Sequence, residues 1–216
     1  MYVRPVCIRE VMAIKLMAVT DDVHETEDLL RILLEIHPYV DYVQVREKRK
    51  SADAVYQMCR ELLAEGLPAH KLWINDRLDI ALLLGLKQVH IPGHGLPLEE
   101  LKELYPDVRI GAPIHSLEEA VKAEAAGVTY ALYGHCFSTA SKKGKQPQPL
   151  ANLRSIRQNI RVPLYGIGGI DVGRLVSLKA LEIDGAAVMS AIFSAKDPLD
   201  AVKKLREECL RLEEFQ

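Results

Sequence analysis

The alternation of short β-rich runs with longer amphipathic runs constrains the fold of this chain more than any other feature. Eight β-rich runs recur along the sequence, at Lys15–Thr20, Asp41–Arg46, Lys71–Asn75, Lys87–Ile91, Val108–Ala112, Thr129–Tyr133, Pro163–Ile167 and Gly185–Met189. Runs with helical periodicity separate them, as in residues 25–36. Alternation of this kind predicts a parallel sheet, and eight units suit a closed barrel.

An open, doubly wound sheet is the alternative architecture for such a pattern. That type of sheet normally carries a glycine fingerprint after its first strand when it binds dinucleotides, whereas the first strand here ends AVTDD, without glycine. We therefore predict the α/β class, with a single (β/α)8 TIM barrel over residues 13–216. The chain has 216 residues, above the roughly 200 at the lower limit for barrels. Residues 1–12 form an N-terminal extension without an assigned function.

Composition excludes several classes of function. Lys and Arg number 28 and Asp and Glu number 30, so no excess positive charge would attract nucleic acid or an anionic membrane. No apolar run approaches the roughly 20 residues of a membrane span, and the N-terminus lacks an apolar signal core. The four cysteines form no zinc-type spacing. We expect a cytoplasmic protein that binds anions only through a local arrangement.

The unusual polar residues cluster where the expected strands end, which is where barrel enzymes place their chemistry. Candidate substrate-binding residues at these positions are Arg46, Lys48, Asn75, His115, Ser116 and, in the long polar segment Gly134–Pro149, Lys142. Arg46 and Lys48 alternate along the second strand, so they share a side and can meet a carboxylate or a phosphate; alternatively they belong to a charged surface.

A phosphate site is predicted after the seventh and eighth strands. Gly168 and Gly169 allow positive φ and close approach of the backbone to a ligand, and the helix that begins near Asp171 directs free N–H groups at an anion. Met189 and Ser190 end the neighbouring strand and begin another helical turn. Loops after strands seven and eight are the usual phosphate site of barrels.

His135 is the candidate catalytic residue, since it directly follows the sixth strand and an imidazole exchanges protons near neutral pH. By position alone an exposed loop histidine is an equal alternative. Cys136 beside it points to the other side in an extended chain, which disfavours a Cys–His nucleophile. His90 and His94 lie at a strand end and a loop and do not share a helix face, which disfavours metal binding. Ser116 with Glu119 fits a helix-capping pattern.

The chain resembles the thiamine phosphate synthase superfamily from about residue 15 to near its end. The resemblance rests on the order and placement of VREK (45–48), INDRLDIA (74–81), QVHIP (88–92), HSLEEA (115–120), GHCFSTASKKG (134–144), GIGGI (166–170) and AVMSAIF (187–193). The resemblance implies a barrel that acts on a phosphorylated thiazole.

Two branches of the superfamily compete. The synthase joins a pyrimidine pyrophosphate to a thiazole phosphate with magnesium, and its pattern has Gly-Pro where this chain has Gly134-His135. That pattern also has an acidic magnesium residue where this chain has Gly95, although Asp76 remains. In the thiazole tautomerase branch, which needs no metal, the resemblance implies that the histidine is the acid/base residue.

The sequence thus favours an isomerase of thiamine biosynthesis that aromatises 2-(2-carboxy-4-methylthiazol-5(2H)-ylidene)ethyl phosphate. His135 would move the proton, the glycine loops would hold the phosphate, and Arg46 and Lys142 would meet the carboxylate. This reaction needs no metal and no cofactor. Two alternatives stay open: a magnesium-dependent thiamine phosphate synthase, and a regulator that binds thiazole phosphate without turnover. A small phosphorylated thiazole is the expected partner, and a homodimer is possible.

Overall fold

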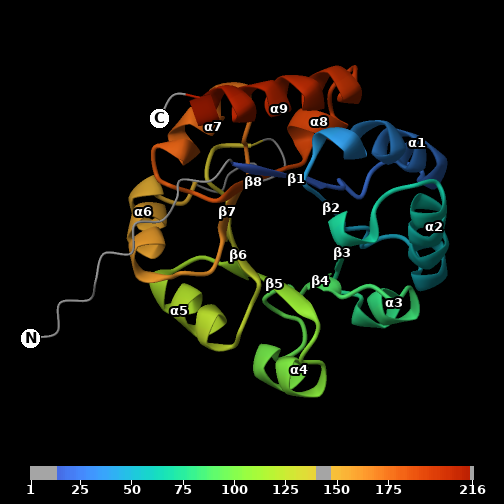
Figure 1. Ribbon diagram of the computed structural model, residues 1–216, viewed down its shortest axis with the longest axis horizontal. Helices are drawn as coiled ribbons and strands as arrows, with labels where there is room; N and C mark the ends of the chain where they lie inside the picture. The colour runs from blue at the N-terminus through green and yellow to red at the C-terminus, as the bar shows by residue number, and fades with distance from the viewer. Residues whose placement is uncertain (1–13, 140–146, 215–216) are drawn as a thin grey trace, which may run out of the picture.

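Eight parallel strands close into a barrel in the computed structural model, which describes residues 14–139 and 147–214 (Figure 1). The strands follow one another around the barrel, and β8 pairs with β1 to close it. Their bounds are β1 Lys15–Val19, β2 Tyr42–Val45, β3 Leu72–Asn75, β4 Gln88–His90, β5 Arg109–Ile114, β6 Tyr130–Gly134, β7 Leu164–Ile167 and β8 Gly185–Val188. The predicted fold class is confirmed, with the expected strand positions correct to within two residues. The predicted extension, residues 1–12, lies outside the described residues.

Helices form a ring around the barrel (Figure 1). They are α1 Thr26–Ile36, α2 Ala52–Ala64, α3 Leu78–Leu83, α4 Leu98–Leu104, α5 Leu117–Ala125, α6 Leu150–Asn159, α7 Val172–Lys179, α8 Ser190–Phe193 and α9 Pro198–Glu214, with short 3₁₀ turns at His37–Tyr39 and Ala69–Lys71. Within the described ranges, α1 to α7 each follow a strand and return the chain to the start of the next strand, and α8 and α9 follow β8 and close the ring. This places all strand ends that carry the candidate residues at one mouth of the barrel.

Local sequence signals set several helix ends. Ser51 caps α2, since its side chain accepts a hydrogen bond from the Ala54 N–H at 3.2 Å. Gly66 follows the same helix with φ +104°, a left-handed conformation in which glycine avoids the steric cost of a side chain. Asp171 caps α7 through the Arg174 N–H at 3.1 Å. The sequence predicted the start of α7 near Asp171.

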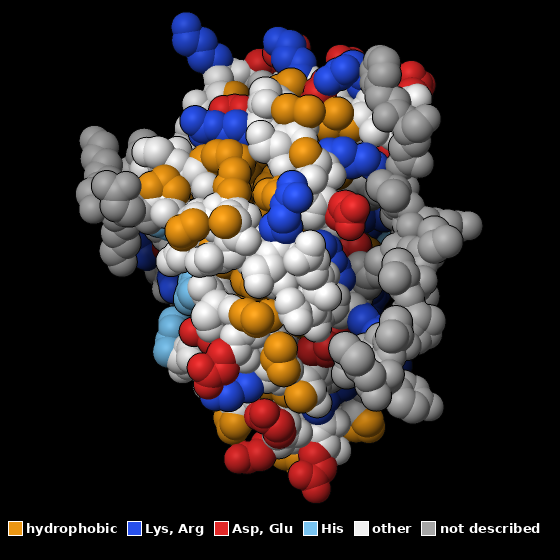
Figure 2. Space-filling model, turned by 90° about the vertical axis from the view of Figure 1, so that its left-hand side faces the viewer, with side chains coloured by type: hydrophobic (Ala, Val, Ile, Leu, Met, Phe, Trp, Pro, Cys, Tyr) orange, Lys and Arg blue, Asp and Glu red, His pale blue; other side chains and the backbone are white. Residues whose placement is uncertain are grey.

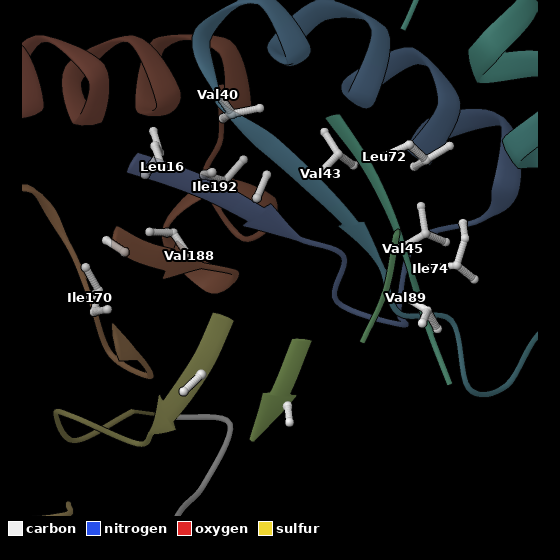
Figure 3. Packing of buried hydrophobic residues seen from close by; sticks show 14 of the residues in the cluster. Leu16, Val40, Val43, Val45, Leu72, Ile74, Val89, Ile170, Val188 and Ile192 are labelled. Carbon is white, nitrogen blue, oxygen red and sulfur yellow. The ribbon is translucent and has the colours of Figure 1, made fainter. Parts of the chain in front are cut away.

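Side chains alternate between two faces of the barrel wall. The larger apolar core lies between the strands and the helices, and Figure 3 shows part of it, including Val43 and Val45 of β2 and Leu72 and Ile74 of β3. A smaller core fills the barrel interior with Met17, Val19, Trp73, Tyr130, Leu132, Tyr165 and Ala187. The interior is therefore packed with side chains below the mouth and is not a pore.

Glycines in two strands make room for the interior aromatic rings. A Cβ on Gly111 would lie 2.2 Å from the ring of Tyr130, and a Cβ on Gly185 would lie 2.1 Å from the ring of Tyr165. These distances are far below van der Waals contact, so the two large rings occupy the space that side chains at the facing positions would need. The barrel floor is fixed by this pairing of glycine with tyrosine.

The outer surface carries charges of both signs. Figure 2 shows one side of the molecule, where acidic side chains gather toward the lower end, near α4 and α5. The first turn of α4 carries Glu99 and Glu100, and the first turn of α5 carries Glu118 and Glu119. In the part of the chain that the structure describes, no helix is long and apolar enough to cross a membrane.

Candidate active site

A cavity of about 250 Å³ opens at the mouth of the barrel, where the strands end. Its floor is apolar, formed by Val19, Leu132, Ile167 and Ala187, and its rim brings together Arg46, His115, His135, Gly168, Gly169, Met189 and Ser190 with Pro113, Gly134, Thr139, Ile170 and Val188. Seven residues that the sequence predicted for the site thus line one cavity, although they come from five separate regions of the chain. The cavity volume is slightly below the roughly 300 Å³ at which typical ligand pockets begin, so it suits one small molecule.

The backbone of His135 lies directly against the two glycines that follow β7. Gly168 has φ +103° and Gly169 has φ +64°, a region that side chains rarely adopt. A Cβ on Gly168 would lie 2.4 Å from the His135 Cβ, and a Cβ on Gly169 would lie 2.5 Å from the Ser138 carbonyl oxygen. The absence of side chains at both positions therefore allows the histidine segment to pack on the glycine loop.

Backbone hydrogen bonds fix this contact. The Cys136 N–H donates to the Ile167 carbonyl at 2.8 Å, the Phe137 N–H donates to the Gly168 carbonyl at 3.0 Å, and the His135 carbonyl accepts from the Gln148 N–H at 2.9 Å. His135 is 6% exposed. His135 is consequently held in the cavity wall by the backbone hydrogen bonds of Cys136 and Phe137 and by the bond to its own carbonyl. Its burial excludes the interpretation as an exposed loop histidine.

The glycine loop leads into α7 and is stabilised from that side as well. The Arg174 guanidinium donates to the Gly169 carbonyl and lies 5.1 Å from the centre of the Phe137 ring. These contacts occupy the carbonyl of Gly169 and hold the glycine loop against the start of α7. The first N–H groups of α7 and α8 have no preceding helical carbonyl, and Met189 and Ser190 bring α8 to the same cavity.

Arg46 brings a positive charge to the cavity rim. Its backbone N–H donates to the Thr20 Oγ1 at 2.8 Å, which continues the junction of β1 and β2 beyond the strands. The side chain is half-buried and lines the cavity. An arginine in this setting can bind a carboxylate or phosphate through two parallel hydrogen bonds.

Beneath the rim, a chain of buried hydrogen bonds crosses the barrel. The His90 Nδ1 lies 2.8 Å from the Tyr130 hydroxyl, which donates to the Gln44 Oε1 at 3.3 Å, and the Gln44 Nε2 donates to the Asn75 Oδ1 at 3.1 Å. Since the tyrosine proton is used toward Gln44, His90 is the donor in the first bond. Burial, together with the charge of Arg46, lowers the pKa of His90 to about 3, so this imidazole is neutral at physiological pH.

This chain determines the orientation of Asn75. Its Oδ1 is an acceptor for Gln44, which leaves the Nδ2 amide as a donor at the end of β3. Sequence reasoning selected Asn75 as a site residue but did not predict the hydrogen-bond chain of Gln44, Tyr130 and His90 that orients it. The alternation of Gln44 with Arg46 along one strand was the available signal, because it places both on the same face.

The other predicted site residues lie away from the cavity. Lys48 is exposed and follows the end of β2, and Ser116 caps α5 by accepting from the Glu119 N–H at 3.1 Å. Neither is among the lining residues, and the substrate-binding role of each stays a prediction. Lys142 lies outside the described residues.

The disfavoured sequence interpretations also find no geometric support. Burial raises the pKa of the Cys136 thiol to about 12, and its Sγ lies 3.6 Å from the Tyr133 carbonyl, so it is a poor nucleophile at neutral pH. His90 is buried in the interior, whereas His94 is exposed. In the described ranges, no group of three or more His, Cys, Asp or Glu side chains is placed to hold a metal ion.

A magnesium ion of the synthase type has a poor donor set here. Asp76, Asp79 and Gly95 line a shared depression, but the Asp79 carboxylate is paired with the Arg77 guanidinium. A Cβ on Gly95 would lie 2.9 Å from the Ile91 Cγ2 and 3.0 Å from the Pro92 carbonyl oxygen. An acidic side chain at position 95 would therefore require this loop to shift, and Asp76 is the one carboxylate of this depression without an ion pair to Arg77.

Comparisons with known proteins identify the family. The sequence profile described as "Thiamine monophosphate synthase" matches residues 16–192. The thiamine-phosphate synthase of Desulfitobacterium hafniense (strain Y51) is 38% identical over 185 residues, which cover 83% of this chain and 88% of the relative. That of Pyrococcus abyssi is 32% identical over 167 residues, covering 76% and 80%.

Solved structures agree with the sequence comparison. The thiamine phosphate pyrophosphorylase from Pyrococcus furiosus superposes with a TM-score of 0.78 at 30% identity, covering 92% of this chain and 96% of that one. A 3-hexulose-6-phosphate synthase superposes with a TM-score of 0.72 at 18% identity, over 90% and 99% of the two chains, which supports the fold alone. With its barrel, its glycine loop and these relatives, the chain belongs to the thiamine monophosphate synthase family, a family of enzymes of thiamine biosynthesis.

Proposed function

We propose that the protein is a thiazole tautomerase, which converts the non-aromatic 2-carboxy-thiazolylidene ethyl phosphate into the aromatic 2-carboxy-thiazole ethyl phosphate. The observation that carries the proposal is the buried imidazole of His135 in the cavity wall, packed on the glycine loop. A histidine so placed lies beside the expected phosphate site and can transfer a proton to or from a bound thiazole.

The substrate pose follows from the chemistry of the cavity. Its phosphate would accept hydrogen bonds from the N–H groups around Gly168, Gly169 and Ser190, and its carboxylate would pair with Arg46. The methylated ring would lie on the apolar floor. The ring would then be held at both ends, which fixes its position relative to His135.

The reaction needs proton transfer and no redox chemistry. Loss of the proton from the ring carbon that bears the carboxylate, and gain of one at the exocyclic carbon, convert the substrate to an aromatic thiazole. Aromatisation supplies the driving force, and a positioned acid or base contributes about 10²–10⁴-fold in rate. No step requires a metal.

The second candidate is a magnesium-dependent thiamine phosphate synthase, which the names of the relatives favour. Arg46 and Lys48 are at positions that also match the pattern of the synthase. Against it stand His135 in place of the synthase proline and the tightly packed Gly95 in place of the acidic residue.

The test measures both activities on the same preparation. We expect turnover of the carboxy-thiazolylidene phosphate in the presence of EDTA, monitored by formation of the aromatic thiazole, and a loss of about 10²-fold or more in His135→Asn. His70→Asn is the matched control, because His70 is exposed at the opposite end of the barrel, before β3. Full activity of His135→Asn would refute the mechanism, and robust thiamine phosphate formation from both synthase substrates with magnesium would favour the second candidate.

A further inference from the structure

A second histidine, His115, lines the same cavity as His135. It follows β5 directly, whereas His135 follows β6, and these two strands are neighbours in the barrel. The two imidazoles differ in burial, because His115 is exposed whereas His135 is buried. The site therefore offers two proton-transfer groups, one of them in ready exchange with water.

A hydrogen bond fixes the tautomer of His115. Its Nδ1 lies 3.1 Å from the carbonyl oxygen of Gly134. A carbonyl oxygen can only accept a hydrogen bond, so Nδ1 carries the hydrogen. In the neutral imidazole the lone pair is then on Nε2, which makes Nε2 the basic atom of this side chain.

The backbone at His115 is also held. Its N–H donates to the Glu119 Oε2 at 2.6 Å, and the Ser116 side chain caps the same helical turn. The contacts of the main chain and of Nδ1 together restrict where Nε2 can lie. Such restraint at both ends is typical of a side chain that must present one atom to a ligand.

The proposed reaction moves two protons at two different carbon atoms. One C–H bond breaks at the ring carbon that bears the carboxylate, and one C–H bond forms at the exocyclic carbon. A single imidazole can serve both positions only if it reaches both in turn, whereas two imidazoles can serve one each.

We infer that His115 is a second catalytic residue, which removes the ring proton through Nε2 while His135 protonates the exocyclic carbon. This inference rests on the proposed tautomerase function. The electrons of the broken C–H bond form the new ring C=N bond, the former C=N pair becomes the new ring C=C bond, and the exocyclic C=C pair takes the proton from the His135 imidazolium. His115 then releases its proton to water, and His135 regains one through the cavity, so protons and electrons balance.

The variant His115→Asn separates this role from a structural one. The asparagine amide can replace Nδ1 as a donor to the Gly134 carbonyl but has no atom equivalent to the basic Nε2. We expect kcat to fall by about 10²-fold or more, with KM and the urea midpoint little changed. Activity of this variant within about threefold of wild type would overturn the inference.

A labelled substrate provides a second readout that a structural role would not affect. With deuterium on the ring carbon and the reaction run in ordinary water, transfer to the exposed His115 predicts that the label is lost to solvent. Deuterium recovered on the side-chain carbon of the wild-type product would show that one group moves the proton between both carbons, and would overturn the inference. A wild-type enzyme without turnover would instead refute the proposed function, so the two failures are distinguishable.

Discussion

The contact between Gly168 and His135 leads to a quantitative prediction for Gly168→Ala. The new Cβ would lie 2.4 Å from the His135 Cβ and 2.9 Å from its Cα, so the catalytic segment must move. Two costs add in the folded state. Placing alanine at φ +103° costs about 1–2 kcal/mol, and forcing a methyl group into a packed contact costs about 1–3 kcal/mol.

Gly66→Ala is the matched control for this variant. Gly66 has φ +104°, almost the same as Gly168, but a Cβ there would meet nothing within 4 Å. We expect urea unfolding to show a loss of about 1–2 kcal/mol for Gly66→Ala and about 2–5 kcal/mol for Gly168→Ala. Activity should fall by at least about 10-fold in Gly168→Ala alone, because small displacements of a catalytic group are costly.

The two variants together test the packing argument. Equal losses of stability in both, with full activity in Gly168→Ala, would mean that only backbone strain matters and that His135 does not depend on the glycine loop. A large loss of activity in Gly66→Ala would refute the assignment of the site to this end of the barrel.

Three further predictions follow from the site. Tyr130→Phe should lower the free energy of unfolding by about 1–3 kcal/mol, because it leaves a buried donor and a buried acceptor unpaired; Tyr165→Phe, in the same aromatic cluster, should lower it less, and equal effects would contradict the hydrogen-bond chain. Because the pKa of His90 is about 3 when folded and about 6.5 when unfolded, the unfolded chain binds the extra proton between these values. Stability should therefore decline as pH falls below about 6.5, by up to about 1.4 kcal/mol per pH unit from this group. The urea midpoint of His90→Gln should decline less steeply with falling pH than that of the wild type. Parallel pH profiles of the two proteins would refute the assignment of His90 as a buried neutral imidazole. Arg46→Gln should raise KM for the carboxylated substrate by about 10–100-fold, whereas Lys48→Gln, at a residue outside the cavity lining, should raise it less in steady-state assays, and the reverse order would contradict the proposed pose.

The fold was largely predictable because its signals are local. Periodicity located every strand, and the capping residues Ser116 and Asp171 marked helix starts that the structure reproduces. Such signals depend on residues a few positions apart, whose geometry the backbone dictates. The closure of the barrel then followed from the number of units.

The details of the site were less predictable because they depend on distant contacts. Tyr130 and Gln44 are 86 positions apart, and the contact of Gly168 with His135 arises only when β6 and β7 pair. Ser116 was predicted both to cap a helix and to bind substrate. Its hydroxyl caps α5, and the residue does not line the cavity. Strand ends therefore indicate which residues reach the mouth, but not which partners their side chains find there.

One measurement tests the proposed function most directly: the rate at which the purified protein aromatises the carboxy-thiazolylidene phosphate with EDTA present. The proposal predicts catalytic turnover that is lost by about 10²-fold or more in His135→Asn and retained in His70→Asn. An absence of turnover in the wild-type protein, with thiamine phosphate formed from the two synthase substrates and magnesium, would contradict it.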